Sequence, residues 1–111
     1  FLSKLLNKDV IFDKFIFSFY MFDDKNYDKL KSLFKPHVDH SKYGGLVYLN
    51  KESDCRGGTG FYKKNDWNLT EIVKMKYNRF VIYPANIWHS VHISKGDFTD
   101  KYRVTQNFFI K

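Results

Sequence analysis

Short runs in which apolar and polar residues alternate fill most of the chain, and this two-residue period is typical of β-strands. The longest run, Ile11–Phe22, is apolar on much of both faces, so we expect it to form a largely buried strand. Later strands are expected around His37 and at six segments rich in Val, Ile, Phe, Tyr and Thr. These segments are Gly45–Leu49, Gly58–Tyr62, Glu71–Lys76, Arg79–Tyr83, His89–Ile93 and Val104–Ile110.

A short helix is expected between the first strand and the His37 segment. Apolar residues recur there at helical spacing from Tyr27 to Phe34, and Pro36 disfavours helical geometry at the residue before it. The chain thus has about eight strands, one minor helix and no helical crossover between strands. This pattern predicts an all-β fold, a two-sheet jelly roll or double-stranded β-helix.

The length of 111 residues suits one domain with one hydrophobic core, so a single domain is expected over residues 1–111. Because the sequence starts at Phe1 and runs at once into apolar residues, we expect upstream N-terminal elements to be missing. Cys55 is the only cysteine, which excludes an internal disulfide framework and a multi-cysteine metal cluster. No apolar run is long enough for a membrane span and no secretory signal is present, so a cytoplasmic protein without a membrane partner is expected.

The formal net charge of +7 raises the question of a polyanionic partner. The basic residues are scattered, however, and Lys63-Lys64 is the only lysine doublet. Nucleic acid is therefore not the favoured partner. Arginine is rare beside the many lysines and occurs only at Arg56, Arg79 and Arg103, so each arginine invites a specific explanation.

The segment His37-Val38-Asp39-His40 is the first candidate for chemistry. On an extended strand, residues two apart share a face, so His37 and Asp39 can converge on one point while Val38 and His40 face the other way. With His89 from a distant strand, two imidazoles and one carboxylate would bind a metal on one side and leave positions open, as in non-haem Fe(II) oxygenases. An isolated His-x-Asp is common by chance, so this interpretation depends on the surrounding sequence.

The surrounding sequence, from Pro36 to Lys111, resembles the catalytic core of the Fe(II)- and 2-oxoglutarate-dependent dioxygenases, and most of all the branch similar to prolyl 4-hydroxylases. Several motifs with the family's order and spacing carry this resemblance. Besides the His-x-Asp motif they are Gly45–Asn50, which ends in Tyr-Leu-Asn; Gly57–Phe61, which resembles Gly-Gly-x-Thr-x-Phe with one residue fewer; Asn78–Tyr83; Trp88–Val91; and Arg103–Thr105.

The resemblance implies an oxygenase-like β-barrel domain in which His37, Asp39 and His89 bind Fe(II), with no further catalytic side chain. It implies an oxidoreductase, a hydroxylase that uses dioxygen and 2-oxoglutarate and releases succinate and CO2. The expected substrate is a peptide or a small molecule. The product type and the oligomeric state stay open.

The resemblance also implies where the co-substrate 2-oxoglutarate binds. Arg103 would pair with its distal carboxylate, a role that suits a planar guanidinium able to donate two parallel hydrogen bonds. Thr105, two residues on and on the same strand face, could add a hydroxyl donor to that carboxylate. Tyr48 is a further candidate for this pocket.

Two alternatives of other classes remain. A cupin-like metal-binding protein would use the same barrel and ligands without 2-oxoglutarate, and it would not need Arg103. A non-catalytic basic binding module, for example for nucleic acid, would keep its function without His37 and Asp39, and its binding would weaken steeply with salt.

Overall fold

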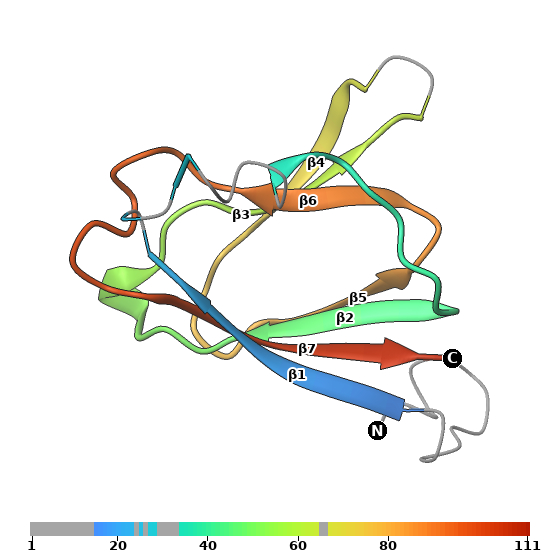
Figure 1. Cartoon of the computed structure of the whole chain (residues 1–111), viewed down its shortest axis with the longest axis horizontal. Helices are drawn as coiled ribbons and strands as arrows, with labels where there is room; N and C mark the ends of the chain where they lie inside the picture. The colour runs from blue at the N-terminus through green and yellow to red at the C-terminus, as the bar shows by residue number, and fades with distance from the viewer. Residues whose placement is uncertain (1–14, 24, 26, 29–33, 65–66) are drawn as a thin grey trace.

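Seven β-strands are the main elements of the part of the chain that the structure describes (Figure 1). The structure is a computed structural model, and it describes residues 15–23, 25, 27–28, 34–64 and 67–111. The strands are β1 (Phe15–Phe22), β2 (Tyr43–Tyr48), β3 (Gly58–Tyr62), β4 (Leu69–Lys74), β5 (Phe80–Pro84), β6 (Trp88–His92) and β7 (Arg103–Ile110), with a short 3-10 helix η4 (Glu52–Asp54) between β2 and β3.

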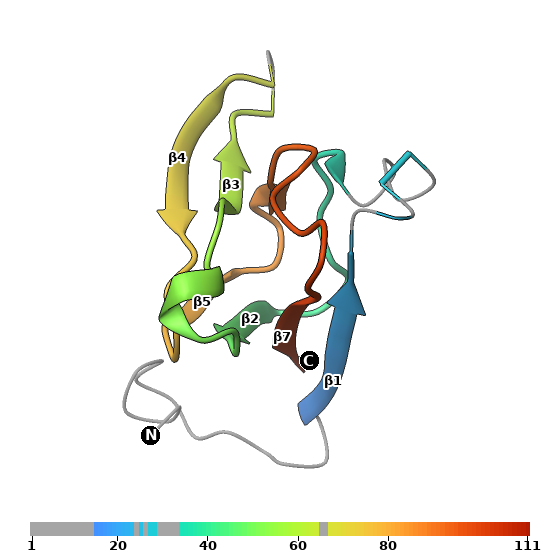
Figure 2. The ribbon, with the colours of Figure 1, turned by 90° about the vertical axis from the view of Figure 1, so that its left-hand side faces the viewer.

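The strands form two antiparallel sheets. One has the strand order β1-β7-β2-β5 and the other has the order β4-β3-β6. Figures 1 and 2 show the three-stranded sheet lying over the four-stranded one, with the β3–β4 hairpin extending beyond the rest. The prediction of an all-β protein is confirmed at this level.

The core lies between the two sheets because the strands bury alternate residues. On β2 and β5 the inward positions are Leu46, Tyr48, Val81 and Tyr83, and side chains of the other sheet such as Phe61 pack against them. Gly44 lies directly under the Tyr83 ring, since a Cβ atom there would be 2.9 Å from a ring carbon. The bulky phenol ring therefore needs glycine at this position.

Seven of the about eight expected strands are observed, most with small shifts of their bounds. Gly58–Tyr62 is observed with the expected bounds, whereas the strand expected over Glu71–Lys76 starts and ends two residues earlier, as β4. Its register is fixed by the hairpin with β3, in which Gly58 pairs with Lys74. The expected first strand is observed over residues 15–22, and its residues 11–14 lie outside the described part.

The His37 segment differs from the expected strand, because it forms a single β-bridge with His89 rather than a continuous ladder. Most of the helix expected over residues 27–34 lies outside the described residues. Among the residues that are described, no helix has the length and apolar character needed to cross a membrane.

Candidate metal centre and its cavity

Backbone hydrogen bonds place the His-x-Asp segment against β6. The His37 N–H donates to the carbonyl of His89, and the His89 N–H donates to the carbonyl of His37, both at 3.0 Å. The Asp39 N–H donates to the carbonyl of Ala85 in the β5–β6 turn at 2.9 Å. Two histidines from distant parts of the sequence are thus held side by side by main-chain bonds that require no metal.

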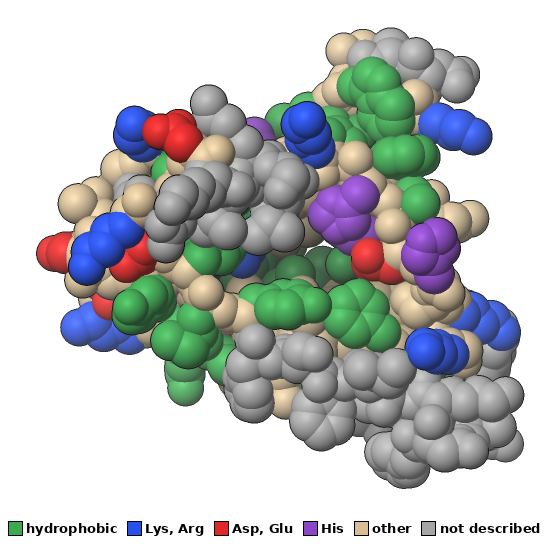
Figure 3. All heavy atoms as spheres, in the orientation of Figure 1, with side chains coloured by type: hydrophobic (Ala, Val, Ile, Leu, Met, Phe, Trp, Pro, Cys, Tyr) green, Lys and Arg blue, Asp and Glu red, His purple; other side chains and the backbone are tan. Residues whose placement is uncertain are grey.

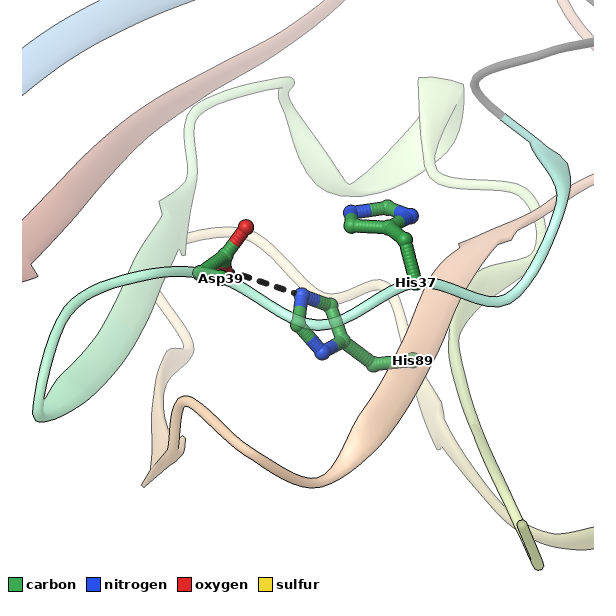
Figure 4. Close-up of side chains that lie close together, drawn as sticks. All are labelled: His37, Asp39 and His89. Carbon is green, nitrogen blue, oxygen red and sulfur yellow. Dashed lines mark ion pairs between the residues drawn. The ribbon is translucent and has the colours of Figure 1, made fainter.

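The side chains of His37, Asp39 and His89 converge, as Figure 4 shows. Their potential ligand atoms all lie within 4.8 Å of one another, and the two imidazole rings have centroids 4.6 Å apart. An ion bound about 2.1 Å from each ligand keeps neighbouring ligand atoms about 3 Å apart. The Nε2 atom of His89 and Oδ2 of Asp39 already have this spacing, at 3.1 Å. A small shift of the exposed His37 ring would complete the site.

Each histidine has its Nδ1 atom next to a main-chain carbonyl two residues earlier. The distance is 3.0 Å from His37 to the carbonyl of Lys35 and 2.7 Å from His89 to the carbonyl of Ile87. A proton on Nδ1 donates to that carbonyl and leaves the Nε2 lone pair free to bind a metal. Both rings are therefore held in the tautomer that a metal site needs.

The contact between His89 and Asp39 bears on whether the triad suits a bound cation. With its proton on Nδ1, a neutral His89 would direct a lone pair of Nε2 toward the Asp39 carboxylate, which is unfavourable. A cation between Nε2 and the carboxylate would make both contacts favourable. The hydrogen bond with His89 lowers the pKa of Asp39, against the opposing effect of burial, so that this residue is a carboxylate at neutral pH. The donor set therefore fits a divalent cation.

A cavity of about 340 Å³ opens beside these three residues and runs between the sheets. Figure 3 shows a hollow in this face, bordered by histidine and acidic side chains at one end and by hydrophobic side chains along one edge. Besides the three candidate ligands it is lined by Tyr20, Met21, Phe22, Leu46, Thr59, Tyr83, Ser90, Val91, Arg103, Thr105, Asn107 and Phe109.

Arg103 lies in the wall of this cavity and is only 3% exposed. Among the described residues its Nε atom has no hydrogen-bond partner, and Nη2 makes a long contact of 3.5 Å with the carbonyl of Gly58. The guanidinium carbon lies 5.6 Å from the ring centroids of Phe22 and Tyr48, and no carboxylate of the described residues pairs with it.

Burial accordingly lowers the pKa of Arg103. A buried charge without a partner is costly, and it is normally retained where a ligand supplies the partner. The unpaired Nε atom of Arg103 could therefore donate a hydrogen bond to an anion in the cavity.

The β7 strand places Arg103, Thr105, Asn107 and Phe109 on one face, and all four line the cavity. The expectation that Thr105 shares the face of Arg103 is thereby met. Its hydroxyl, however, donates to Oδ1 of Asn107 at 2.6 Å.

Tyr48 lies behind the cavity wall and not in it. This side chain is fully buried, and its hydroxyl contacts Oγ1 of Thr59 at 2.6 Å and the carbonyl of Val73 at 3.3 Å. The guanidinium carbon of Arg103 lies over the Tyr48 ring, 5.6 Å from its centroid. The structure thus places Tyr48 next to Arg103 but outside the lining, whereas Thr59 is part of the lining.

Two lining residues, Asn107 and Tyr83, were missed from the sequence. Asn107 has the same strand parity as Arg103 and Thr105, so the period of two along β7 could have found it. The Tyr83 ring contacts the His89 ring with centroids 4.5 Å apart. Burial, together with the nearby Asp39 carboxylate, raises the pKa of Tyr83, which therefore stays a neutral phenol.

No known protein-family model matches this sequence, and no curated protein matches it either. The functional argument therefore depends on the geometry and chemistry of the site.

Proposed function

We propose that this protein is an Fe(II)- and 2-oxoglutarate-dependent dioxygenase that hydroxylates a peptide or small-molecule substrate. The observation that carries the proposal is the buried guanidinium of Arg103, which has an unpartnered Nε atom and no carboxylate partner among the described residues, in the same cavity as the triad of His37, Asp39 and His89. A metal-binding end and a carboxylate-binding end in one cavity suit a keto acid that chelates a metal and carries a second carboxylate.

Each part of the cavity would have its own role in the reaction. The triad would hold Fe(II) through two nitrogens and one oxygen on one side of the metal, which leaves positions for a chelating co-substrate and dioxygen. Arg103 would pair with the distal carboxylate. When bound, the iron and 2-oxoglutarate would supply the oxidation of a C–H bond by dioxygen, with succinate and CO2 as co-products. The apolar walls would exclude water from the reacting centre.

We also propose that the two sheets belong to a double-stranded β-helix. The bridge between His37 and His89 supports this, because it adds the His37 segment to the free side of β6. The three-stranded sheet would then have a fourth member opposite the four-stranded sheet. Such a barrel has its ligand site at the open end between the sheets.

The cavity lining also bears on the substrate. Tyr20 and Met21 line the cavity and are 48% and 59% exposed, so its entrance is apolar. Asp39 is the only acidic residue among the described residues of the lining, and the metal would use its carboxylate. A neutral apolar group is therefore expected to enter, from a peptide or a small molecule.

An anaerobic titration of the protein with Fe(II) and then with 2-oxoglutarate tests the proposal without a known substrate. Chelation of protein-bound iron by the keto acid should produce a visible charge-transfer band. The band should be lost in Arg103→Ala at the same co-substrate concentration and kept in Arg56→Ala, which removes an exposed arginine as a matched control. Iron binding without the band would favour a cupin-like metal protein, and a folded chain that binds no iron would refute the enzyme assignment.

A further inference from the structure

The hydrogen bond between Thr105 and Asn107 determines which polar hydrogens the β7 wall offers to a ligand. Thr105 is 1% exposed and has a single hydroxyl proton, which is donated to Oδ1 of Asn107 at 2.6 Å. The threonine can then present only oxygen lone pairs to the cavity. A lone pair facing a carboxylate is repulsive, so Thr105 cannot be the direct donor to an anion while this bond persists.

Asn107 shows the complementary situation. Its oxygen accepts from Thr105, and no hydrogen bond from its amide nitrogen to any residue in the described part of the chain is present. The side chain lines the cavity and is only partly buried, so the free N–H groups can reach a ligand there. An amide whose oxygen is fixed has its nitrogen fixed as well, because the two atoms lie on one rigid plane.

We propose that Asn107 is a co-substrate-binding residue, with its amide donating to an oxygen of 2-oxoglutarate, and that Thr105 is the positioning residue that orients this amide. This inference rests on the proposed function. Residues 103 and 107 lie about 13 Å apart along an extended strand, so Arg103 and Asn107 would donate hydrogen bonds to separate acceptor groups of the ligand. The site thereby selects a ligand with acceptor oxygens away from the carboxylate that Arg103 binds.

Substitutions that keep the size of each side chain test the arrangement. Asn107→Asp can still accept the hydrogen bond from Thr105 but replaces the amide donor with a negative charge. We expect the dissociation constant of 2-oxoglutarate from the Fe(II)-loaded full chain, measured anaerobically from the charge-transfer band, to rise about 10- to 100-fold. Fe(II) affinity, measured separately, should be unchanged. Asn107→Ser, which lacks both charge and amide, should weaken binding less and serves as the second variant if Asn107→Asp does not fold.

Thr105→Val and Thr105→Ser separate positioning from direct contact. We expect Thr105→Val to raise the dissociation constant about three- to tenfold, because the amide is no longer oriented, and Thr105→Ser to bind as the wild type does. In an Asn107→Ser background, Thr105→Val should have no further effect. A full additional effect in that background would show that Thr105 contacts the co-substrate directly and would overturn the inference.

The wild-type titration distinguishes failure of this inference from failure of the proposed function. If the wild-type protein gives the charge-transfer band and Asn107→Asp and Asn107→Ser bind 2-oxoglutarate with the same affinity, the inference is wrong and the dioxygenase proposal stands. If the wild-type protein binds iron but gives no band, both are wrong.

Discussion

Replacing Arg103 with methionine should have opposite effects on the free protein and on the protein with its ligands. Methionine has a similar length and fills the same buried space without a charge. Because the Arg103 guanidinium has no carboxylate partner among the described residues, its removal should stabilise the free protein. The same removal should take away most of the stabilisation that 2-oxoglutarate gives to the iron-loaded protein.

The structure sets the size of both effects. Removal of an uncompensated buried charge should raise the free energy of unfolding by about 3 kcal/mol. Loss of the two contacts between Arg103 and the rings of Phe22 and Tyr48 should lower it by about 2 kcal/mol. The free energy of unfolding of the free variant should thus rise by about 1 kcal/mol, or roughly 4–8 °C in Tm. Loss of a two-bond carboxylate contact should weaken 2-oxoglutarate binding about 100-fold.

Thermal unfolding followed by circular dichroism under anaerobic conditions measures both quantities. With Fe(II) present and 2-oxoglutarate at about 100 times the wild-type Kd, the co-substrate should stabilise the wild type by about 2.7 kcal/mol and the methionine variant by only about 0.4 kcal/mol. Arg56→Met, at an exposed position, should change neither value by more than about 0.5 kcal/mol. A methionine variant that is less stable than the wild type without ligand, or equally stabilised by the co-substrate, would refute the reasoning.

Three further predictions concern the metal ligands and the core. His37→Ala should lower the Fe(II) affinity at least about 100-fold in an anaerobic calorimetric titration, while His40→Ala, beside the site, should leave it unchanged. Because the pKa of Asp39 is lowered in the folded state from an ordinary value of 3.8, its contribution is complete above that pH and is lost as pH falls below it. The stability advantage of the metal-free wild type over Asp39→Asn in urea should therefore be the same at pH 7 and pH 5 and should shrink as pH falls below 3.8. Gly44→Ala should destabilise the fold by about 1–3 kcal/mol because the new methyl group meets the Tyr83 ring, and Tyr83→Leu in the same chain should relieve most of this cost in urea unfolding.

The strand pattern could be predicted from the sequence because alternation of side chains is a local property. The alternation correctly placed Thr105 on the same strand face as Arg103, and His37 on the same side of its segment as Asp39. It could not show that the His37 segment makes a single bridge to β6, because that depends on a partner about fifty residues away.

The chemistry of the anion site depended on three-dimensional contacts that no local pattern contains. The lack of a partner for Nε of Arg103 among the described residues follows from everything that packs around it, and arginine at a buried position is more often paired. The Thr105 hydroxyl, expected to donate to a carboxylate, donates instead to Oδ1 of Asn107. Asn107 belongs to no motif in the sequence, so this hydrogen bond could not be predicted. Tyr48 shares a strand face with Leu46, yet Leu46 lines the cavity and Tyr48 does not, because its hydroxyl is turned to Oγ1 of Thr59.

The main-chain bridge between His37 and His89 has a consequence for the order in which the molecule is assembled. The bridge closes a long loop, and pairings between residues far apart in the sequence form slowly and late during folding. Iron bound by the proposed triad would therefore not act as a template for early chain collapse, since His37 and His89 meet only once β6 is in place. Under the proposed function, metal loading would follow folding, and bound iron would act chiefly by slowing the unfolding of the two packed sheets.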